Sequence, residues 1–546
     1  MQGRSRLDLE LLDAEMIAGD LVPAGSVFAF LAAHRRELFP DAFTADLFSS
    51  VTGRPSLPAD LVGSVLVLKE LYDLSDAQTA DALKFDIRWK VACGRSLTQL
   101  SFDPSALVYW RRRIAASKRP DRVFDAVADV IAQTGILRGR RRRCVDSTVF
   151  DDAVATQDTV TQLVAAIRKV ARVVDGAAEV IARVCALDYS RPGRPPIDWD
   201  DPQAKQDLVS DLVNDALAVL AELAGEGAPA RDDVAADALG LLALVAGQDV
   251  EPAGGSDGTD GRWRIARKVA PDRVISTVDT RARHTRKCKS KRRDGYRGHV
   301  AAEPDTGLIT DCEMTMATGP GSTDAENGVK MAARDRFRNA GDGAGPEPEA
   351  GTSADAGQEQ KQGAGLEVYG DSAYGSGEAR AAYRQGGHDT VIKPGPLRSA
   401  VPGGFTVDDF TIDEDQGTVT CPAGITRQMS RGRTVTFGAA CASCPLRQQC
   451  TVAAGGRSMT IHPQEGLLRA ARAQARTEEF RRAYPTRSMI ERIIARAATQ
   501  NGRRVRLRYI GTEKNDAWLH NRCAALNLRT LIKRGLTCRE GAWIPG

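Results

Sequence analysis

The sequence predicts an α/β protein in which short strands alternate with long helical segments. Residues 24–135 carry apolar side chains at helical spacing, and so do residues 157–247. Short runs rich in β-branched residues lie between and after these segments, as at Cys144–Phe150 and Leu366–Gly370. This alternation of helical and extended segments is the pattern of an α/β fold.

Length and composition are those of a soluble globular protein. The chain has 546 residues, which is enough for two or three domains, with 42% hydrophobic and 27% charged residues. It contains no apolar run of about 18 residues, so we expect no transmembrane helix and no membrane partner. The first residues, Met1–Glu10, lack the apolar core of a signal peptide. We therefore expect a cytoplasmic protein.

Positive charge is concentrated near the end of the chain. The formal net charge of the whole chain is only +4, but residues 467–536 contain 17 Lys and Arg against 5 Asp and Glu. Such an asymmetry is typical of a nucleic-acid-binding face, and the alternative is a solvated basic surface.

The first helical segment contains features of a small DNA-binding domain. Pro58 stands where a first helical turn tolerates proline, and Ser75 is a suitable N-cap for the next helix. The run Tyr109–Arg113 places three arginines beside two aromatic residues, which could contact phosphate and base. A plain helical bundle is the alternative for this segment.

The first strand contains an aspartate that needs an explanation. The dense cationic run Arg138–Arg143, which includes Arg141 and Arg142, directly precedes the strand and would attract phosphate. Asp146 then lies among apolar neighbours in Cys144–Phe150. A carboxylate in a buried strand is costly unless it is paired, hydrogen-bonded or metal-bound.

The middle of the chain continues the sheet after an inserted helical region and a Gly/Asp-rich linker at 251–261. We expect strands at Val274–Val278, Gly298–Ala302 and Leu308–Met314, the last two forming a hairpin. Between the first two, Arg281–Arg293 contains 8 Lys and Arg, among them Lys289 and Arg292. We interpret this stretch as a loop that lies along a DNA backbone.

A second acidic position follows residues 338–365, which have the composition of a disordered linker. The pattern after Leu366 is a strand, then Asp371, a glycine-rich turn, and a helix capped by Ser376. Acidic residues at the carboxyl ends of strands in α/β sheets face the usual ligand crevice. An aspartate that only closes a turn is the alternative.

Four cysteines form a candidate metal site. Cys441 and Cys444 have C-x2-C spacing, and Cys421 and Cys450 lie within about 20 residues of them, which fits tetrahedral zinc. Four thiolates would hold together a small insert with little core. Free reduced cysteines are the alternative, because a disulfide is not expected in the cytoplasm.

The third acidic position is Glu491, at the edge of the apolar stripe of an amphipathic helix. Ser488-x-x-Glu491 fits a capping box, in which the glutamate only closes the start of the helix. The alternative is a carboxylate that points into a cleft. Because Arg487 and Arg492 lie beside it, this carboxylate would suit an anionic substrate only with a metal ion between them.

The spacing Tyr484-x2-Arg487-x3-Glu491 resembles the signature around the last acidic residue of bacterial insertion-sequence DDE transposases. That signature continues x6-Lys, where this chain has Ala498, and Arg496 or Arg503 could substitute for the lysine. The helical N-terminal segment, the cysteine-rich insert and the Asp-x-x-Tyr-x-Ser pattern at Asp371 also resemble this group.

The resemblance implies an RNase H-like mixed sheet with Asp146, Asp371 and Glu491 as the catalytic triad. It implies Mg²⁺ or Mn²⁺ on these carboxylates, and two such ions could bind one phosphodiester. Hydrolysis at the element's ends would be followed by attack of the freed 3′-OH on target DNA. We expect the DNA contacts to come from the following residues: Tyr484, Arg487, Arg496, Arg503, Arg504, Arg141, Arg142, Lys289 and Arg292.

The expected partners are double-stranded DNA, as terminal inverted repeats and as target, and a second copy of the chain in a synaptic homodimer. The protein would be associated with the nucleoid of a bacterium. Two alternatives share the same residues. One is a catalytically decayed transposase that acts as a DNA-binding regulator, and the other is a metal-dependent nuclease that cuts without joining.

These interpretations divide the chain into successive parts. The expected parts are a helical DNA-binding domain at 1–135, the start of the catalytic domain at 136–156, a helical insertion with linker at 157–262, the continued sheet at 263–337, a linker at 338–365, the strand and helix with the second aspartate at 366–395, a cysteine-rich insert at 396–465, and a catalytic helix with a basic region at 466–546.

Overall fold

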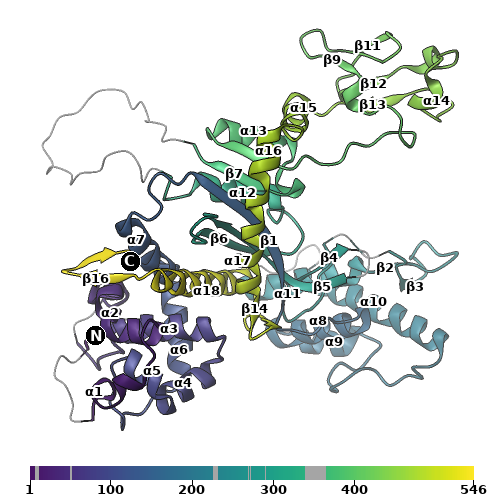
Figure 1. The fold of residues 1–546 in the computed structure, drawn as a ribbon. Helices are drawn as coiled ribbons and strands as arrows, with labels where there is room; N and C mark the ends of the chain where they lie inside the picture. Colours follow the sequence, from purple (N-terminus) through teal and green to yellow (C-terminus); the bar gives the residue numbers. More distant parts are fainter. Residues whose placement is uncertain are drawn as a thin grey trace, which may run out of the picture.

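The computed structural model describes residues 1–5, 12–49, 52–224, 232–268, 270, 272–288, 291–338 and 365–546. Its centre is a six-stranded mixed sheet flanked by helices, which confirms the predicted α/β class (Figure 1). Lys289 and all but the end residues of the expected linker at 338–365 lie outside the described residues.

The sheet combines antiparallel and parallel pairing around its first strand. β1 pairs antiparallel with β5 on one side and parallel with β7 on the other. β5 also pairs with β4 and β6, and β7 pairs in parallel with β8. The bounds are β1 (Arg142–Asp151), β4 (Arg283–Cys288), β5 (Lys291–Ala302), β6 (Ile309–Met316), β7 (Glu367–Gly370) and β8 (Asp389–Ile392).

The structure confirms the predicted hairpin of β5 and β6 and corrects two other expectations. The stretch Arg281–Arg293 is not a loop, because β4 and the start of β5 form a second hairpin there. Residues 274–278 form no strand, and Val274 makes only an isolated bridge to Arg283. Arg292 and Arg293 are neighbours on β5, so their side chains point to opposite faces of the sheet and cannot both follow one DNA backbone.

Helices cover both faces of the sheet. Residues such as Val145 and Val368 face α12 and α13, whereas Cys144 and Tyr369 belong to the core on the side of α17 and α18. The bounds are α12 (Asp324–Ala333), α13 (Gly377–Gln385), α17 (Ser488–Ala498) and α18 (Thr512–Lys533).

α18 is the element that fastens the sheet to its neighbours. The side-chain amide of Asn527 accepts a hydrogen bond from the backbone N–H of Ile309 and donates one to its carbonyl, both at 2.8 Å. β6 is an edge strand, so this side chain satisfies backbone groups that would otherwise be exposed or unpaired. Arg522, which is buried, donates to the carbonyls of Ala497 and Thr499 at 2.9 Å. It thereby satisfies carbonyls at the C-terminal end of α17.

The N-terminal helices share one hydrophobic core with the sheet through α18. Ser75 caps α4, as the sequence predicts, and the structure adds Gln78 as the partner in a full capping box. The bounds of these helices are α1 (Ala14–Ala18), α2 (Val27–Leu38), α3 (Ala59–Tyr72), α4 (Asp76–Phe85), α5 (Ile87–Ala92), α6 (Ser105–Ala115) and α7 (Arg122–Thr134).

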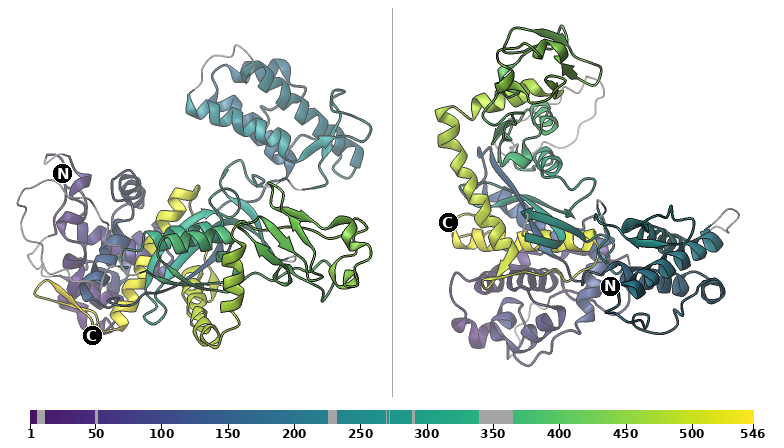
Figure 2. Two further views of the ribbon diagram at one scale, coloured as in Figure 1. Left: turned by 90° about the horizontal axis from the view of Figure 1, so that it is seen from above. Right: turned by 90° about the vertical axis from the view of Figure 1, so that its right-hand side faces the viewer.

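The helical insertion after β1 has a hydrophobic core of its own and projects away from the sheet (Figure 2). Its apolar residues pack helix against helix, which explains why the 157–247 segment shows helical spacing without any acidic motif. The bounds are α8 (Thr159–Val173), α9 (Ala177–Val184), α10 (Pro202–Ala224), α11 (Asp233–Gln248), β2 (Val250–Pro252) and β3 (Trp263–Ile265).

The cysteine-rich segment forms a small separate module at the far end of α15, α16 and α17, which rise as one column in Figure 1. Its elements are β9 (Thr411–Asp413), β10 (Thr418–Thr420), β11 (Thr426–Gln428), β12 (Thr434–Thr436), α14 (Arg447–Cys450) and β13 (Ser458–Thr460). The remaining elements are α15 (Glu465–Gln474), α16 (Glu478–Ala483), β14 (Thr499–Gln500), β15 (Arg503–Arg504), β16 (Thr537–Arg539) and β17 (Ala542–Ile544). In the part of the chain that the structure describes, no helix has the length and apolarity to cross a membrane.

Candidate active site

The pairing of β1 with β7 brings the two aspartates together. Cys144 lies opposite Tyr369 in this parallel register, and both face the side of α17. Asp146 and Asp371 each follow two residues later, so the alternation of a strand directs them to the same side. Asp371 stands just past the end of β7, where it caps the short 3₁₀ turn η4 (Ser372–Tyr374) through the N–H of Ala373.

Glu491 reaches the same place from α17. This helix directly continues the 3₁₀ turn η7 (Tyr484–Arg487), so its first residue, Ser488, already has helical geometry. The capping-box alternative is therefore wrong, because no side chain caps this helix start. Ile490 and Ile493 fix the helix on the sheet, while the carboxylate of Glu491 is exposed.

Arg487 lies between the three carboxylates. Its Nη1 is 3.0 Å from Glu491 Oε1, and its Nη2 is 3.2 Å from Asp146 Oδ2 and 3.7 Å from Asp371 Oδ2. The side chain is only 14% exposed, and its Nε is buried and has no hydrogen-bond partner among the described residues. One guanidinium therefore holds acidic groups from β1, the end of β7 and α17.

Burial and neighbouring charges shift the pKa values of groups in this cluster. Burial raises the pKa of Asp146 from 3.8 to about 6, assisted by the nearby charges of Asp371 and Asp324 and opposed by the N–H of Ser147 and by Arg487. Burial opposes the charge on Arg487, but Asp146, Tyr484, Asp371 and Glu491 raise its pKa above its usual value. The arginine stays charged, and Asp146 is ionised at neutral pH only at a cost.

A polar network supports β1 from its other face, and no motif in the sequence predicts it. Ser147 donates its N–H to Asp146 Oδ1 at 2.8 Å and its hydroxyl to Asp324 Oδ1 at 2.6 Å. Asp324, in the first turn of α12, also pairs with Arg297 at 3.0 Å. His299 lies 3.5 Å from Asp324, and burial lowers its pKa to about 3, so it is a neutral, structural histidine. This network fixes the strand that carries Asp146.

The chemistry of the three carboxylates fits Mg²⁺ or Mn²⁺, which prefer oxygen ligands. Their oxygens are not all within 4.8 Å of one another, so a shared ion would draw them together. Among the described residues, the group that meets this spacing is Asp121, Asp516 and His520. The two aspartates raise the pKa of this buried histidine against the effect of burial, so an ion pair explains the grouping.

Several expected DNA contacts are engaged within the protein. Arg142 pairs with Asp305, and Arg141 lies 3.9 Å from Asp389. Arg292 is exposed on β5 beside a hollow of about 420 Å³. Tyr484 stacks on Phe480, with ring centroids 5.1 Å apart.

The position that carries lysine in the signature is part of the core here. Ala498 is only 4% exposed and packs in the main hydrophobic cluster, so a lysine at this place would be buried. Arg496 extends from the same helix to the β5–β6 turn. Its Nη2 is so close to Gly307 in this turn that a Cβ added to the glycine would be 3.8 Å away. Glu491 is five residues earlier on the helix and therefore points in another direction.

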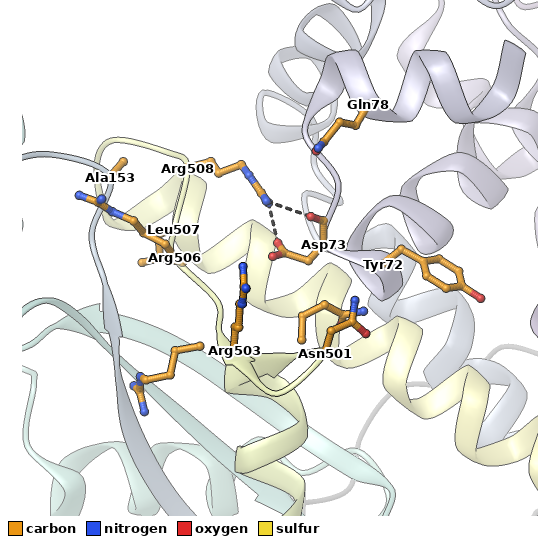
Figure 3. A pocket seen from close by; sticks show the side chains of 11 residues that line it. Tyr72, Asp73, Gln78, Ala153, Asn501, Arg503, Arg506, Leu507 and Arg508 are labelled. Carbon is orange, nitrogen blue, oxygen red and sulfur yellow. Dashed lines mark hydrogen bonds and ion pairs between the residues drawn. The ribbon is translucent and has the colours of Figure 1, made fainter. Parts of the chain in front are cut away.

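The exposed arginines after α17 gather at a hollow of about 960 Å³ between the N-terminal helices and the end of β1 (Figure 3). Val505 and Leu507 are buried, and the arginines on either side of them point outward. Arg508 pairs with Asp73 at 2.5 Å, and Arg504 lies 3.8 Å from Asp151. The hollow is lined by Tyr72, Asp73, Gln78, Ala153, Gln500, Asn501, Arg503, Arg504, Arg506, Leu507 and Arg508.

The four cysteines Cys421, Cys441, Cys444 and Cys450 line one cavity of about 20 Å³ in their module. None of them forms a disulfide with a described residue, and the N–H of Arg457 points at Cys441 Sγ from 3.5 Å. Burial raises the pKa of Cys450. A thiolate at that position would therefore need a cation beside it.

Two family models match segments near the two ends of the chain. Residues 18–113 match a transposase domain (DUF772), and residues 420–532 match a transposase DDE domain. No curated protein and no solved structure matches the chain. The second match contains the cysteines and Glu491, whereas Asp146 and Asp371 lie outside both matched ranges.

The matched domains indicate a transposase, and the resemblance to insertion-sequence DDE transposases is confirmed. Such a protein binds DNA, and its family generally depends on a divalent metal.

We expect Asp146→Asn to stabilise the protein at pH 7.5 in EDTA. The pKa of Asp146 is higher in the folded than in the unfolded chain, so the unfolded chain binds fewer protons between pH 4 and 6, and stability falls as pH rises through this window. Removing the charge should recover at most about 3 kcal/mol at pH 7.5 and almost nothing at pH 4. The melting temperature of both proteins at the two pH values measures this.

Glu478→Gln on α16 is the control, because this side chain is 62% exposed. It should change the melting temperature little at either pH. A variant Asp146→Asn that melts below the wild type at pH 7.5 would contradict the expectation.

Proposed function

We propose that the chain is a metal-dependent transposase that cleaves DNA at the ends of its element and joins the freed 3′ ends to target DNA. The observation that carries this proposal is the convergence of Asp146, Asp371 and Glu491 on Arg487. The three acids are distant in the sequence, and the pairing of β1 with β7 and the packing of α17 on β1 bring them close together. The order of strands and the two covering helix layers support an RNase H-like catalytic domain.

The residues have distinct roles in this proposal. Asp146 and Asp371, on a rigid sheet, would hold Mg²⁺ or Mn²⁺, and the exposed Glu491 would complete the ligand set. When bound there, divalent cations supply activation of a water or a 3′-OH and stabilise the leaving oxygen. Tyr484 and Arg487 lie beside the carboxylates and would position the scissile phosphate.

The hollow in Figure 3 is suited to hold the DNA next to this site. The side chain of Arg503 is exposed and makes no ion pair or hydrogen bond with any described residue, so its charge is available for a phosphate. The hollow begins just past the end of α17, and this end is about 10 Å from Glu491 along the helix, which is about three base pairs of B-DNA. DNA that contacts the hollow could therefore also reach the carboxylates.

Zinc in the cysteine module is part of the same proposal. The four thiols supply a suitable donor set, and a cavity of about 20 Å³ has room for a single ion or water molecule. Their sulfur atoms do not form a group within 4.8 Å, so zinc would contract the module. Its role would be to hold the end of the α15–α17 column.

Synapsis of two DNA ends would require two copies of the chain, with residues 1–135 as an additional DNA-binding part. The regulator and the nuclease remain alternatives to be separated by products. A regulator would bind without cleavage, and a nuclease would cleave without joined products.

We expect Asp146→Asn, Asp371→Asn and Glu491→Gln each to lower cleavage about a hundredfold or more, because loss of a metal ligand removes several kcal/mol of transition-state stabilisation. The assay uses full-length protein, Mg²⁺ or Mn²⁺, and a labelled duplex that carries the ends of the DNA flanking the gene. Duplex binding should remain nearly intact.

Glu478→Gln again serves as the matched control and should cleave and join like the wild type. Near-normal cleavage by any one of the three variants would remove that residue from the site. A wild type that binds the duplex without cleaving it in either metal would favour the regulator.

Arg503→Gln should weaken duplex binding and reduce the slope of log K against log salt by about 0.9, the value expected for one lost phosphate contact. Arg183→Gln, on the helical insertion, is the control and should leave the slope unchanged. The measurement is a binding titration at several salt concentrations. An unchanged slope for Arg503→Gln would exclude this arginine from the DNA contact.

The double variant Cys441→Ser and Cys444→Ser should lose about one zinc per chain and melt at a lower temperature, because the module has little other core. Metal analysis of protein purified without chelator measures the zinc. Cys538→Ser, outside the module, should retain it. Absence of zinc from the wild type would refute the proposal for this module.

A further inference from the structure

The position of Arg487 has a consequence for how a metal ion reaches the carboxylates. Its two terminal nitrogens contact one oxygen from each of Asp146, Asp371 and Glu491, at 3.2, 3.7 and 3.0 Å. These oxygens are the atoms that a shared cation would use. The guanidinium thus occupies the space between the acids in which a divalent ion would have to bind.

The guanidinium and a divalent ion are mutually exclusive in this position. Mg²⁺ requires oxygens at about 2.0–2.1 Å in near-octahedral geometry, so the carboxylates would have to close around it. In the arrangement with Arg487 they remain farther apart than 4.8 Å as a group. Two cations between the same acids would also repel each other at short range in a partly buried site.

We propose that Arg487 is an exchangeable counter-ion of the catalytic site. It holds the three carboxylates in place before the metal binds and is displaced when a divalent cation arrives. The inference rests on the proposed function of the triad as metal ligands. One guanidinium neutralises only one of the three acidic charges, so the site retains the negative charge that attracts a divalent ion.

The local structure permits such an exchange. Arg487 is the last residue of η7, at the junction of a 3₁₀ turn with α17, and its long side chain can leave by changing rotamers while the backbone stays fixed. A displaced guanidinium beside the site is suited to a phosphate of the DNA, which it can bind through two N–H groups. Displacement by the metal would thus present Arg487 to the substrate.

This role makes Arg487 a positioning residue. Its effect on metal binding is opposite to that of a residue that only supports the ligands. A residue that only shapes the ligand set improves metal binding, whereas an exchangeable counter-ion competes with it. Removal of Arg487 should therefore tighten the binding of a metal ion while it lowers the stability of the metal-free site.

The experiment measures Mn²⁺ binding to the full-length, zinc-supplemented protein without DNA, by electron paramagnetic resonance of free Mn²⁺. Arg487→Gln should bind Mn²⁺ about tenfold more tightly than the wild type, as expected for loss of a close competing charge. Arg487→Lys, which keeps a charge but not the fork of the guanidinium, should lie between them. Arg492→Gln, an exposed arginine on the same helix, should equal the wild type.

A second measurement keeps the test independent of folding. In EDTA, Arg487→Gln should melt below the wild type, and saturating Mn²⁺ should remove most of that difference. Equal or weaker Mn²⁺ binding by Arg487→Gln, with melting restored by Mn²⁺, would overturn the exchange.

Asp146→Asn distinguishes this failure from failure of the proposed function. If Asp146→Asn abolishes Mn²⁺ binding and Arg487→Gln leaves it unchanged, the triad binds metal and only the exchange is refuted. If Asp146→Asn leaves Mn²⁺ binding unchanged, the metal is not on the triad, and the proposed metal site and the exchange both fail.

Discussion

The repulsion between three carboxylates gathered over the two inner strands β1 and β7 is the constraint on which the site depends. Asp146 is half-buried on β1, and the crowding by Asp371 adds to the effect of burial on its pKa. Such a cluster is stable only with a cation inside it. Arg487 supplies that cation from the same helical segment as Glu491, one turn away, so a single helix brings both an acid and its counter-charge to the sheet.

The sheet and the helices packed on it hold the three carboxylates in fixed positions. The parallel register of β1 and β7 places two acids on one side, and the polar network of Ser147 and Asp324 fixes β1 from behind. α18 then secures both the edge strand, through Asn527, and the end of α17, through Arg522. The polar side chains of α18 therefore help to hold α17, the helix that carries Glu491, against the sheet.

Local patterns in the sequence predicted the elements better than their connections. Periodicity located the helices, β1, the β5–β6 hairpin and the caps at Ser75 and Ser376, because those signals are carried by neighbouring residues. The same reasoning failed at 281–293, where charge indicated a loop but pairing with a neighbouring strand produced a hairpin. It also missed Asp324, whose place at the sheet follows from α12 packing on β1 and not from any motif.

The site itself shows where sequence reasoning ends. The three acids were recognisable through strand ends, helix edge and resemblance, but the position of Arg487 between them depends on contacts across 341 residues of chain. The missing lysine illustrates the same limit. Ala498 is buried, so a cation at that position would face the core, while the arginines that line the neighbouring hollow are exposed. In the proposed function, the arginines after the helix would therefore supply the charge for the DNA end that position 498 cannot present.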